Sequence, residues 1–155
     1  MNEKLPKSAR LHHRSLQERL FAEGEKLHDF PVKLIWHALT AEELEANFRS
    51  RVPEGIGPVQ VLVSVPKKKR RKAVDRVLMR RRLREVFRHK RPAVVAMLAG
   101  VPAVRTLSIG LIYMKEANAK TAELDRKLEN LLRKLAAKVK ERYEEDCHGP
   151  AADPD

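Results

Sequence analysis

The chain has 155 residues, with 33 Lys and Arg against 21 Asp and Glu, so its formal net charge is +12 at pH 7. This length suits one domain with a real core, and 43% hydrophobic residues supply that core. Such a charge argues against a neutral soluble enzyme and favours a polyanionic partner.

The first half of the chain predicts a helix followed by two strands. Ser8 has the character of an N-cap, and the helix that follows is expected to run about 15 residues, to Gly24. Alternating apolar residues predict a strand over Phe30–Leu39. Residues 40–57 are expected to form an excursion with a short acidic helical turn. A second strand is predicted over Val59–Val65, stopped by Pro66.

The second half predicts helix, strand and helix. In the helix predicted over 73–90, Met79, Leu83, Val86 and Phe87 share one face. Arg80, Arg84 and Arg88 share the adjoining face, with Arg81 at its edge. A third strand is predicted over Thr106–Met114, and a long amphipathic helix over Glu123–Tyr143.

The predicted order, α-β-β-α-β-α, indicates the α/β class: a single-domain α/β sandwich in which a small sheet is packed with helices. The domain is expected to span residues 8–143. Residues 1–7 are expected to be a flexible N-terminus, and residues 144–155 a disordered acidic tail.

The chain is expected to work in the cytoplasm and not in a membrane. Its N-terminus lacks the apolar segment of a secretory signal, and the single Cys147 excludes a disulfide framework. The apolar stretch 92–114 contains two prolines, two glycines and Arg105, which argue against a transmembrane helix.

The excess charge lies in one segment. Residues 67–91 contain 14 Lys and Arg against two acids, Asp75 and Glu85, and this surplus equals the net charge of the whole chain. A neutral scaffold with one intensely basic segment is typical of a nucleic-acid-binding protein. Arginine suits this role because its guanidinium donates two parallel hydrogen bonds to a phosphate.

The stretch from Val63 to Arg88, VSVPKKKRRKAVDRVLMRRRLREVFR, resembles the protein component of bacterial ribonuclease P. That family carries a strand ending near Ser-Val, a Lys-Lys pair, Ala-Val, an Arg-Asn-Arg element and a basic helix. The matching residues here are Ser64-Val65, Lys67-Lys68, Ala73-Val74, Arg76, Arg80, Arg81 and Arg84.

Features outside this stretch extend the resemblance. The family's opening pattern is matched by Arg10-Leu11, Phe21 and Gly24, and the Pro-Lys-Lys and Ala-Val-Asp-Arg forms look like the variant in Bacteroidetes-type sequences. One departure is clear: the family's Arg-Asn-Arg is Arg76-Val77-Leu78 here.

The resemblance implies a subunit that binds a catalytic RNA and the single-stranded 5′ leader of precursor tRNA. The RNA subunit, with Mg²⁺, would hydrolyse the phosphodiester, so no catalytic residue and no metal ligand is assigned to this chain, and no protein partner is expected. The residues expected to bind RNA are Lys67, Lys68, Lys69, Arg70, Arg71, Lys72, Arg76, Arg80, Arg81, Arg84 and Arg88. Phe21, Trp36 and Tyr113 are candidates to stack on leader bases, with core packing as the alternative for each.

Other interpretations stay open at this point. A structural RNA-binding protein, of the ribosomal or chaperone type, would carry the same charge. A DNA-binding module with 73–90 as recognition helix would need base-reading Asn or Gln, which that helix lacks. PKKKRRK at 66–72 resembles a nuclear import signal, although its place between strand and helix fits a folded loop. Asp75 is expected to cap the helix or to form an ion pair, with metal binding near phosphates as the lesser alternative.

Overall fold

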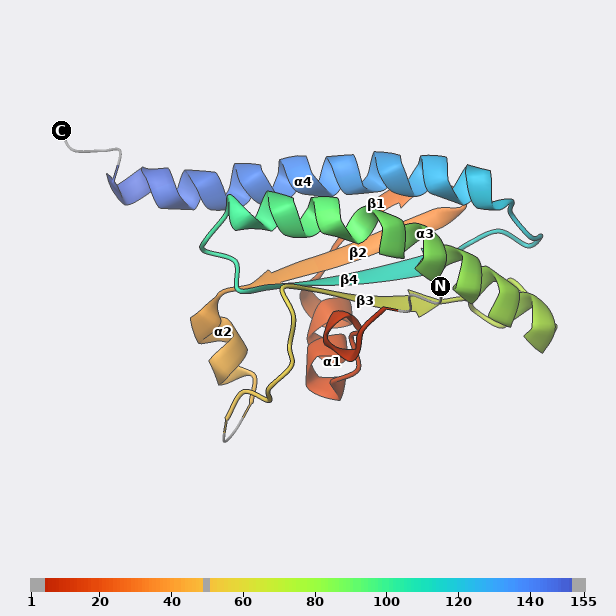
Figure 1. Cartoon of the computed structure of the whole chain (residues 1–155), viewed down its shortest axis with the longest axis horizontal. Helices are drawn as coiled ribbons and strands as arrows, with labels where there is room; N and C mark the ends of the chain where they lie inside the picture. The colour runs from red at the N-terminus through yellow and green to blue at the C-terminus, as the bar shows by residue number, and fades with distance from the viewer. Residues whose placement is uncertain (1–4, 49–50, 152–155) are drawn as a thin grey trace.

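A computed structural model describes residues 5–48 and 51–151, with side chains described through Tyr143. Within these residues one four-stranded sheet has the strand order β1-β2-β4-β3, with helices on both faces (Figure 1). The elements are η1 (Lys7–Ala9), α1 (Arg14–Glu23), β1 (Glu25–Asp29), β2 (Val32–Leu39), α2 (Ala41–Ala46), β3 (Val59–Ser64), α3 (Ala73–Ala99), β4 (Thr106–Tyr113) and α4 (Thr121–Ala151).

The sheet combines antiparallel and parallel pairs. β1 and β2 form an antiparallel hairpin, β2 and β4 are antiparallel, and β3 runs parallel to β4. A parallel pair needs a crossover connection, and α3, which contains most of the basic segment, lies in that connection.

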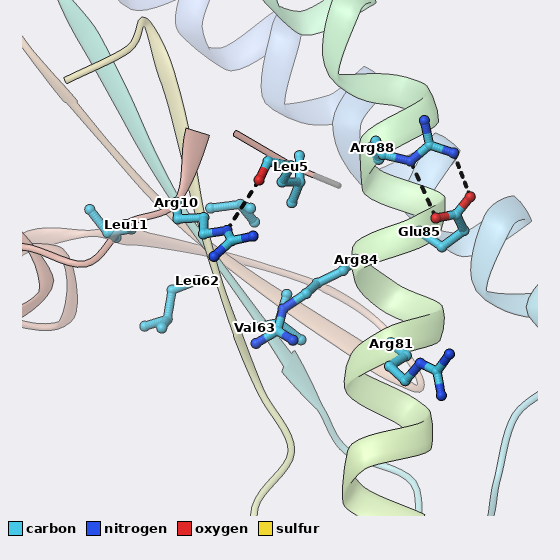
Figure 2. A pocket seen from close by; sticks show the side chains of 10 residues that line it. Leu5, Arg10, Leu11, Leu62, Val63, Arg81, Arg84, Glu85 and Arg88 are labelled. Atoms are coloured by element: carbon cyan, nitrogen blue, oxygen red, sulfur yellow. Dashed lines mark hydrogen bonds and ion pairs between the residues drawn. The ribbon is translucent and has the colours of Figure 1, made fainter. Parts of the chain in front are cut away.

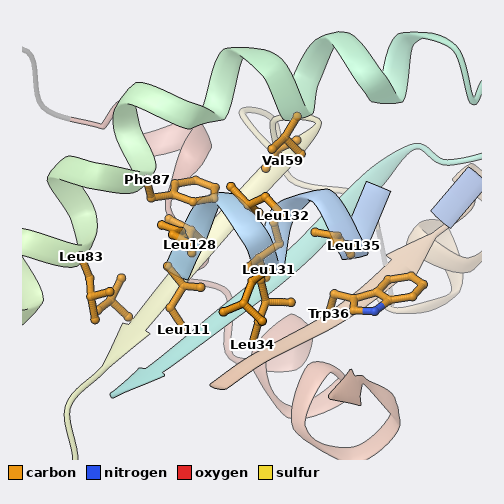
Figure 3. Close-up of a cluster of buried hydrophobic side chains, with 14 of the residues drawn as sticks. Leu34, Trp36, Val59, Leu83, Phe87, Leu111, Leu128, Leu131, Leu132 and Leu135 are labelled. Atoms are coloured by element: carbon orange, nitrogen blue, oxygen red, sulfur yellow. The ribbon is translucent and has the colours of Figure 1, made fainter. Parts of the chain in front are cut away.

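Strand alternation divides the interior into two clusters. On one face, alternate residues of β2, β3 and β4 pack against α3 and α4: Trp36 of β2 lies in the same cluster as Phe87 of α3 and Leu131 of α4 (Figure 3). On the opposite face, Leu16 and Leu20 of α1 cover Ile35. Gly110 of β4 admits α1 here, since a Cβ at this position would lie 3.2 Å from Leu20 Cδ2. Most of the hydrophobic residues are buried in these two layers.

The structure confirms the α/β class, and the expected element order holds with additions. The expected excursion at 40–57 contains α2, which begins with a capping box: Thr40 Oγ1 accepts from Glu43 N (3.2 Å), and Glu43 Oε1 accepts from Thr40 N (2.9 Å). None of the described helices is long and apolar enough to cross a membrane.

Two expected helix boundaries are wrong. The first helix begins at Arg14, not directly after Ser8, because Ser8 lies in η1 and Arg10, which bridges Val61 of β3, is extended. The basic helix continues through Pro92 to Ala99, because Val94 and Leu98 extend its buried face, and this packing outweighs the hydrogen bond that proline cannot donate.

The ends of the domain also differ from expectation. Leu5 is buried in the main cluster and Lys7 begins η1, so residues 5–7 do not belong to a flexible N-terminus, and residues 1–4 lie outside the described residues. α4 continues beyond 143 to Ala151. Residues 152–155 also lie outside the described residues, and the disorder expected of the tail stays a prediction.

Candidate nucleic-acid interface

Hydrogen bonds within the loop, and from Arg76 of α3 to the loop, fix the conformation of the segment before α3. The backbone N–H groups of Lys69 and Arg70 donate to Pro66 O at 3.0 and 3.1 Å. Arg76 donates back to the carbonyl oxygens of Arg70 (3.1 Å) and Arg71 (2.6 Å). The guanidinium of Arg76 therefore shapes the loop, whereas Lys67, Lys68, Arg71 and Lys72 are exposed on it.

Arg70 and Asp75 join this loop to the segment between β4 and α4. Their side chains form an ion pair at 3.0 Å, and both are about four-fifths buried. Arg70 also donates to Glu116 O at 2.8 Å, and Asn118 Nδ2 donates to Asp75 Oδ1 at 3.2 Å. The ion pair expected of Asp75 is confirmed, and Arg70 acts as a structural anchor.

On α3, the arginines have two different environments. Arg82 donates to Ala119 O at 2.6 Å, and Arg91 donates to Val59 O at 3.1 Å, so both hold the helix against its neighbours. Arg81 and Arg84 are exposed, and Arg80 is half-exposed. Arg80 and Arg84 therefore lie beside the buried face of α3, with Arg81 at the edge of that row, as the helical periodicity predicts.

A groove of about 510 Å³ lies between α3, the edge of β3 and the N-terminal segment (Figure 2). Arg84 points into it from α3, and Arg10 points into it from the segment before α1, where its Nε donates to Leu5 O at 3.2 Å. Glu85, the acid that lines the groove, is paired with Arg88 at 2.6 Å.

The electrostatics of this groove favour an anion. Partial burial lowers the pKa of Arg84, and the positive charges of Arg80 and Arg10 lower it further. A phosphate between Arg10 and Arg84 would relieve this repulsion and accept several hydrogen bonds. Arg10 is missing from the cations predicted to bind RNA, and only its place in the Arg10-Leu11 pattern pointed to it.

Two of the three candidate stacking residues are in the core. Trp36 and Tyr113 are 1% and 0% exposed, because strand alternation directs both toward α3 and α4. Their assignment to leader bases is therefore wrong, and core packing accounts for them: the Tyr113 hydroxyl donates to Ala117 O, and the Arg142 guanidinium lies 5.2 Å from the Trp36 ring centroid. Phe21 is 48% exposed at the end of α1 and remains a candidate.

The described side chains do not form a metal centre. No three of their His, Cys, Asp and Glu residues lie together in a way that would hold a metal ion. Asp75, the one acid within the basic loop and the first turn of α3, is occupied by Arg70 and Asn118. The groups that this surface exposes are guanidinium and ammonium groups, which suit hydrogen bonding to phosphate.

Comparisons with known proteins agree on one family. The model of the family described as Ribonuclease P matches residues 5–136. The RNase P protein of Staphylococcus aureus has a similar structure, with TM-score 0.57 and 19% identity, over 86% of this chain and 98% of that chain. The RNase P protein of Thermotoga maritima has TM-score 0.52 and 21% identity, over 86% of this chain and 97% of that chain.

No curated protein sequence matches the chain. At these identities the solved structures establish a shared fold, and the family model, which spans most of the sequence, establishes the relationship. The chain belongs to the ribonuclease P protein family.

Proposed function

We propose that this chain is the protein subunit of a ribonuclease P that matures the 5′ end of precursor tRNA in the cytoplasm. A separate RNA subunit would hydrolyse the phosphodiester, and this chain would bind that RNA and the 5′ leader. The observation that carries the proposal is the family match over residues 5–136, which includes the whole basic segment.

The basic surface supports the contact with the RNA subunit. Exposed cations of the loop (Lys67, Lys68, Arg71 and Lys72) are followed on α3 by Arg81 and Arg84. Structured RNA offers dense phosphate, and each cation that neutralises a phosphate releases counterions, which favours binding.

The opposite face of the sheet supports a contact with the leader. There Leu62, Ser64 and Ile112 of β3 and β4 are only half-buried beside α1, which also carries the exposed Phe21. A partly open sheet face with one exposed aromatic suits unstacked bases of single-stranded RNA.

Mg²⁺ would enter through the RNA. Among the described residues, no three carboxylates, histidines or cysteines lie together in a way that would hold a metal ion, and this supports RNA phosphates as the ligands of Mg²⁺. The ion, when bound by the RNA, supplies charge stabilisation for phosphodiester hydrolysis. The cations of this chain would lower the Mg²⁺ concentration that the RNA needs by neutralising neighbouring phosphates.

A cleavage assay tests the proposal. The protein is mixed with ribonuclease P RNA transcribed from the same genome and with precursor tRNA, at Mg²⁺ concentrations too low for the RNA alone. We expect cleavage at the mature 5′ end that depends on the protein, and a smaller stimulation with precursor tRNA whose leader is shortened to one nucleotide.

Binding to the RNA without any stimulation of cleavage would overturn the proposal. It would favour instead a structural RNA-binding protein without nuclease association. Stimulation that did not depend on leader length would remove the leader contact and leave the contact with the RNA subunit.

A further inference from the structure

Two exposed valines interrupt the cationic surface at the start of α3. Val74 is 71% exposed and Val77 is 45% exposed. They lie three residues apart and therefore share one side of the helix. A single exposed apolar residue needs no explanation, but here two adjacent ones lie inside the most highly charged segment of the chain.

The residues around the valines offer few hydrogen-bond donors at this point. The Arg76 guanidinium is turned back to the carbonyl oxygens of Arg70 and Arg71, and Leu78 packs against the main hydrophobic cluster. Asp75 is paired with Arg70. The first turns of α3 therefore present methyl groups to solvent.

Exposed cations flank the valines along the chain on both sides. Arg71 and Lys72 precede Val74, and Arg81 follows Val77 by four residues on the same side of α3. Val74 and Arg81 are about 10 Å apart along the helix axis, at 1.5 Å per residue. A polyanion that contacts both groups of cations must pass over the valines.

We propose that Val74 and Val77 form an apolar contact for an unpaired nucleotide of the ribonuclease P RNA, whose base or ribose lies on the valine methyl groups while its neighbouring phosphates contact the flanking cations. This inference rests on the proposed function. The flanking cations favour a polyanion over an apolar protein surface as the partner. RNA is a polyanion that also offers apolar surface, because the faces of its unstacked bases are apolar. The RNA subunit is the source because α3 and the candidate leader surface beside α1 lie on opposite faces of the sheet.

The contact makes a distinctive prediction about salt. Because the valines carry no charge, replacing them changes affinity without changing the number of counterions released, whereas replacing a cation changes both. The two kinds of contact are therefore separable in one titration.

The experiment measures equilibrium binding of the full chain to ribonuclease P RNA over a series of KCl concentrations. Val74→Thr with Val77→Thr keeps the shape and β-branching of both side chains but replaces a methyl group of each by a hydroxyl. We expect binding about tenfold weaker at every salt concentration, as the loss of two buried methyl contacts implies, with an unchanged slope of log affinity against log salt.

Three matched measurements accompany this variant. Val74→Leu with Val77→Leu keeps the apolar surface and should retain the affinity. Arg81→Gln should lower the affinity and reduce the slope by about 0.7 to 0.9, the contribution of one phosphate contact. A single-stranded leader oligonucleotide should bind the Thr variant and the parent equally. Circular dichroism should be the same for all variants, because the substituted side chains are exposed.

Equal affinity of the Thr variant and the parent for the RNA would overturn the inference while the proposed function stands. If the Thr variant bound the leader oligonucleotide more weakly than the parent but bound the ribonuclease P RNA equally well, the choice of the RNA subunit as partner would be overturned. A change in the oligomeric state, with RNA affinity unchanged, would assign the valines to a contact between copies and also overturn the inference. If the parent did not bind the RNA at all, the proposed function would fail together with this inference.

Discussion

At the scale of single residues, two glycines that each end a helix differ in whether the surrounding structure has room for a Cβ atom. Gly24 ends α1 in an extended conformation that any residue adopts, but a Cβ there would lie 2.4 Å from Leu20 O and 2.5 Å from Ile35 Cγ2. Gly100 ends α3, and a Cβ there would lie 3.5 Å from Met97 O, an ordinary contact. The first glycine is required by the approach of α1 to β2, and the second is not.

We therefore expect Gly24→Ala to lower the free energy of unfolding by about 1 to 3 kcal/mol, because the methyl group forces α1 and β2 apart. Gly100→Ala is the matched control, and we expect it to be neutral or to stabilise by up to about 1 kcal/mol through reduced freedom of the unfolded chain. Urea denaturation of the two variants measures both. Equal stability of the two would contradict the close approach at Gly24.

His37 makes stability depend on pH. Burial lowers the pKa of His37 from its ordinary value of 6.5, and the Glu23 carboxylate, whose Oε1 lies 3.9 Å from Nε2, opposes this effect. The unfolded chain therefore binds the proton at a higher pH than the folded chain does. The neutral form favours the fold above the unfolded pKa, and that advantage is lost as the pH falls below about 6.5.

We expect thermal unfolding to show this in a comparison with His37→Gln. When the pH is lowered from about 7.5 to about 5.5, the Tm of the parent should decrease by more than the Tm of the variant. This is the range in which an unperturbed histidine takes up its proton. Parallel losses in the two proteins would contradict a buried neutral histidine.

At the scale of elements, α3 separates a face for packing from a face for RNA. Met79, Leu83 and Phe87 are fully buried, whereas Arg84 is exposed beside the groove and Arg80 is half-exposed. Arg80→Ala with Arg84→Ala should therefore weaken RNA binding by more than tenfold, because charged hydrogen bonds to phosphate are lost. The midpoint of urea denaturation should stay nearly unchanged, because the double variant removes no core contact. An unfolded double variant would contradict this division of the helix.

α4 holds the β1–β2 hairpin by its last described side chains. Arg142 Nη2 lies 2.8 Å from Glu25 Oε1, and the Tyr143 hydroxyl donates to Ala38 O at 3.4 Å. Removal of residues 144–155 should preserve stability and RNA binding, whereas removal of residues 140–155 should lower the Tm by several degrees, because the Trp36–Arg142 contact is also lost. If the shorter truncation abolished RNA binding, the tail would not be dispensable.

The elements that were predictable from the sequence are those with strong periodicity. β2, β3, β4 and the amphipathic part of α4 are confirmed within a few residues. β1 was missed because its sequence, EKLHD, has one apolar residue and forms a half-exposed edge strand. The segment before α1 was also missed, because the bridge that keeps Arg10 extended pairs it with Val61, far along the chain.

The candidate site was predictable in its charge but not in its geometry. Periodicity separated Arg80 and Arg84 from the buried face, but it did not show that Arg70 and Arg76 would turn inward to acceptors elsewhere. For Trp36 and Tyr113 the sequence left base stacking and core packing open, because alternation within a strand does not say which face the helices cover. Arg10 joins the groove only through tertiary contact.

At the scale of the whole molecule, the excess of charge lies on one segment of an otherwise neutral scaffold. If the RNA engages about six phosphates, log affinity should fall with log salt at a slope of roughly −4 to −5. Filter binding over a range of KCl concentrations measures this slope. A slope near zero would contradict an interface built on cations and phosphates.

The strand order determines when the sheet can form during synthesis of the chain. β4 is the last strand within the described residues, yet it lies inside the sheet, between β2 and β3. Until residue 113 has left the ribosome, β3 has no partner strand, and the apolar side of α3 has no completed sheet on which to pack. The whole basic segment therefore emerges before the sheet that supports it is complete, and it emerges from a particle made largely of RNA. Release of the nascent chain and closure of the sheet must compete with nonspecific attraction to that RNA, which makes the order of the strands a constraint on how the protein is made as well as on how it works.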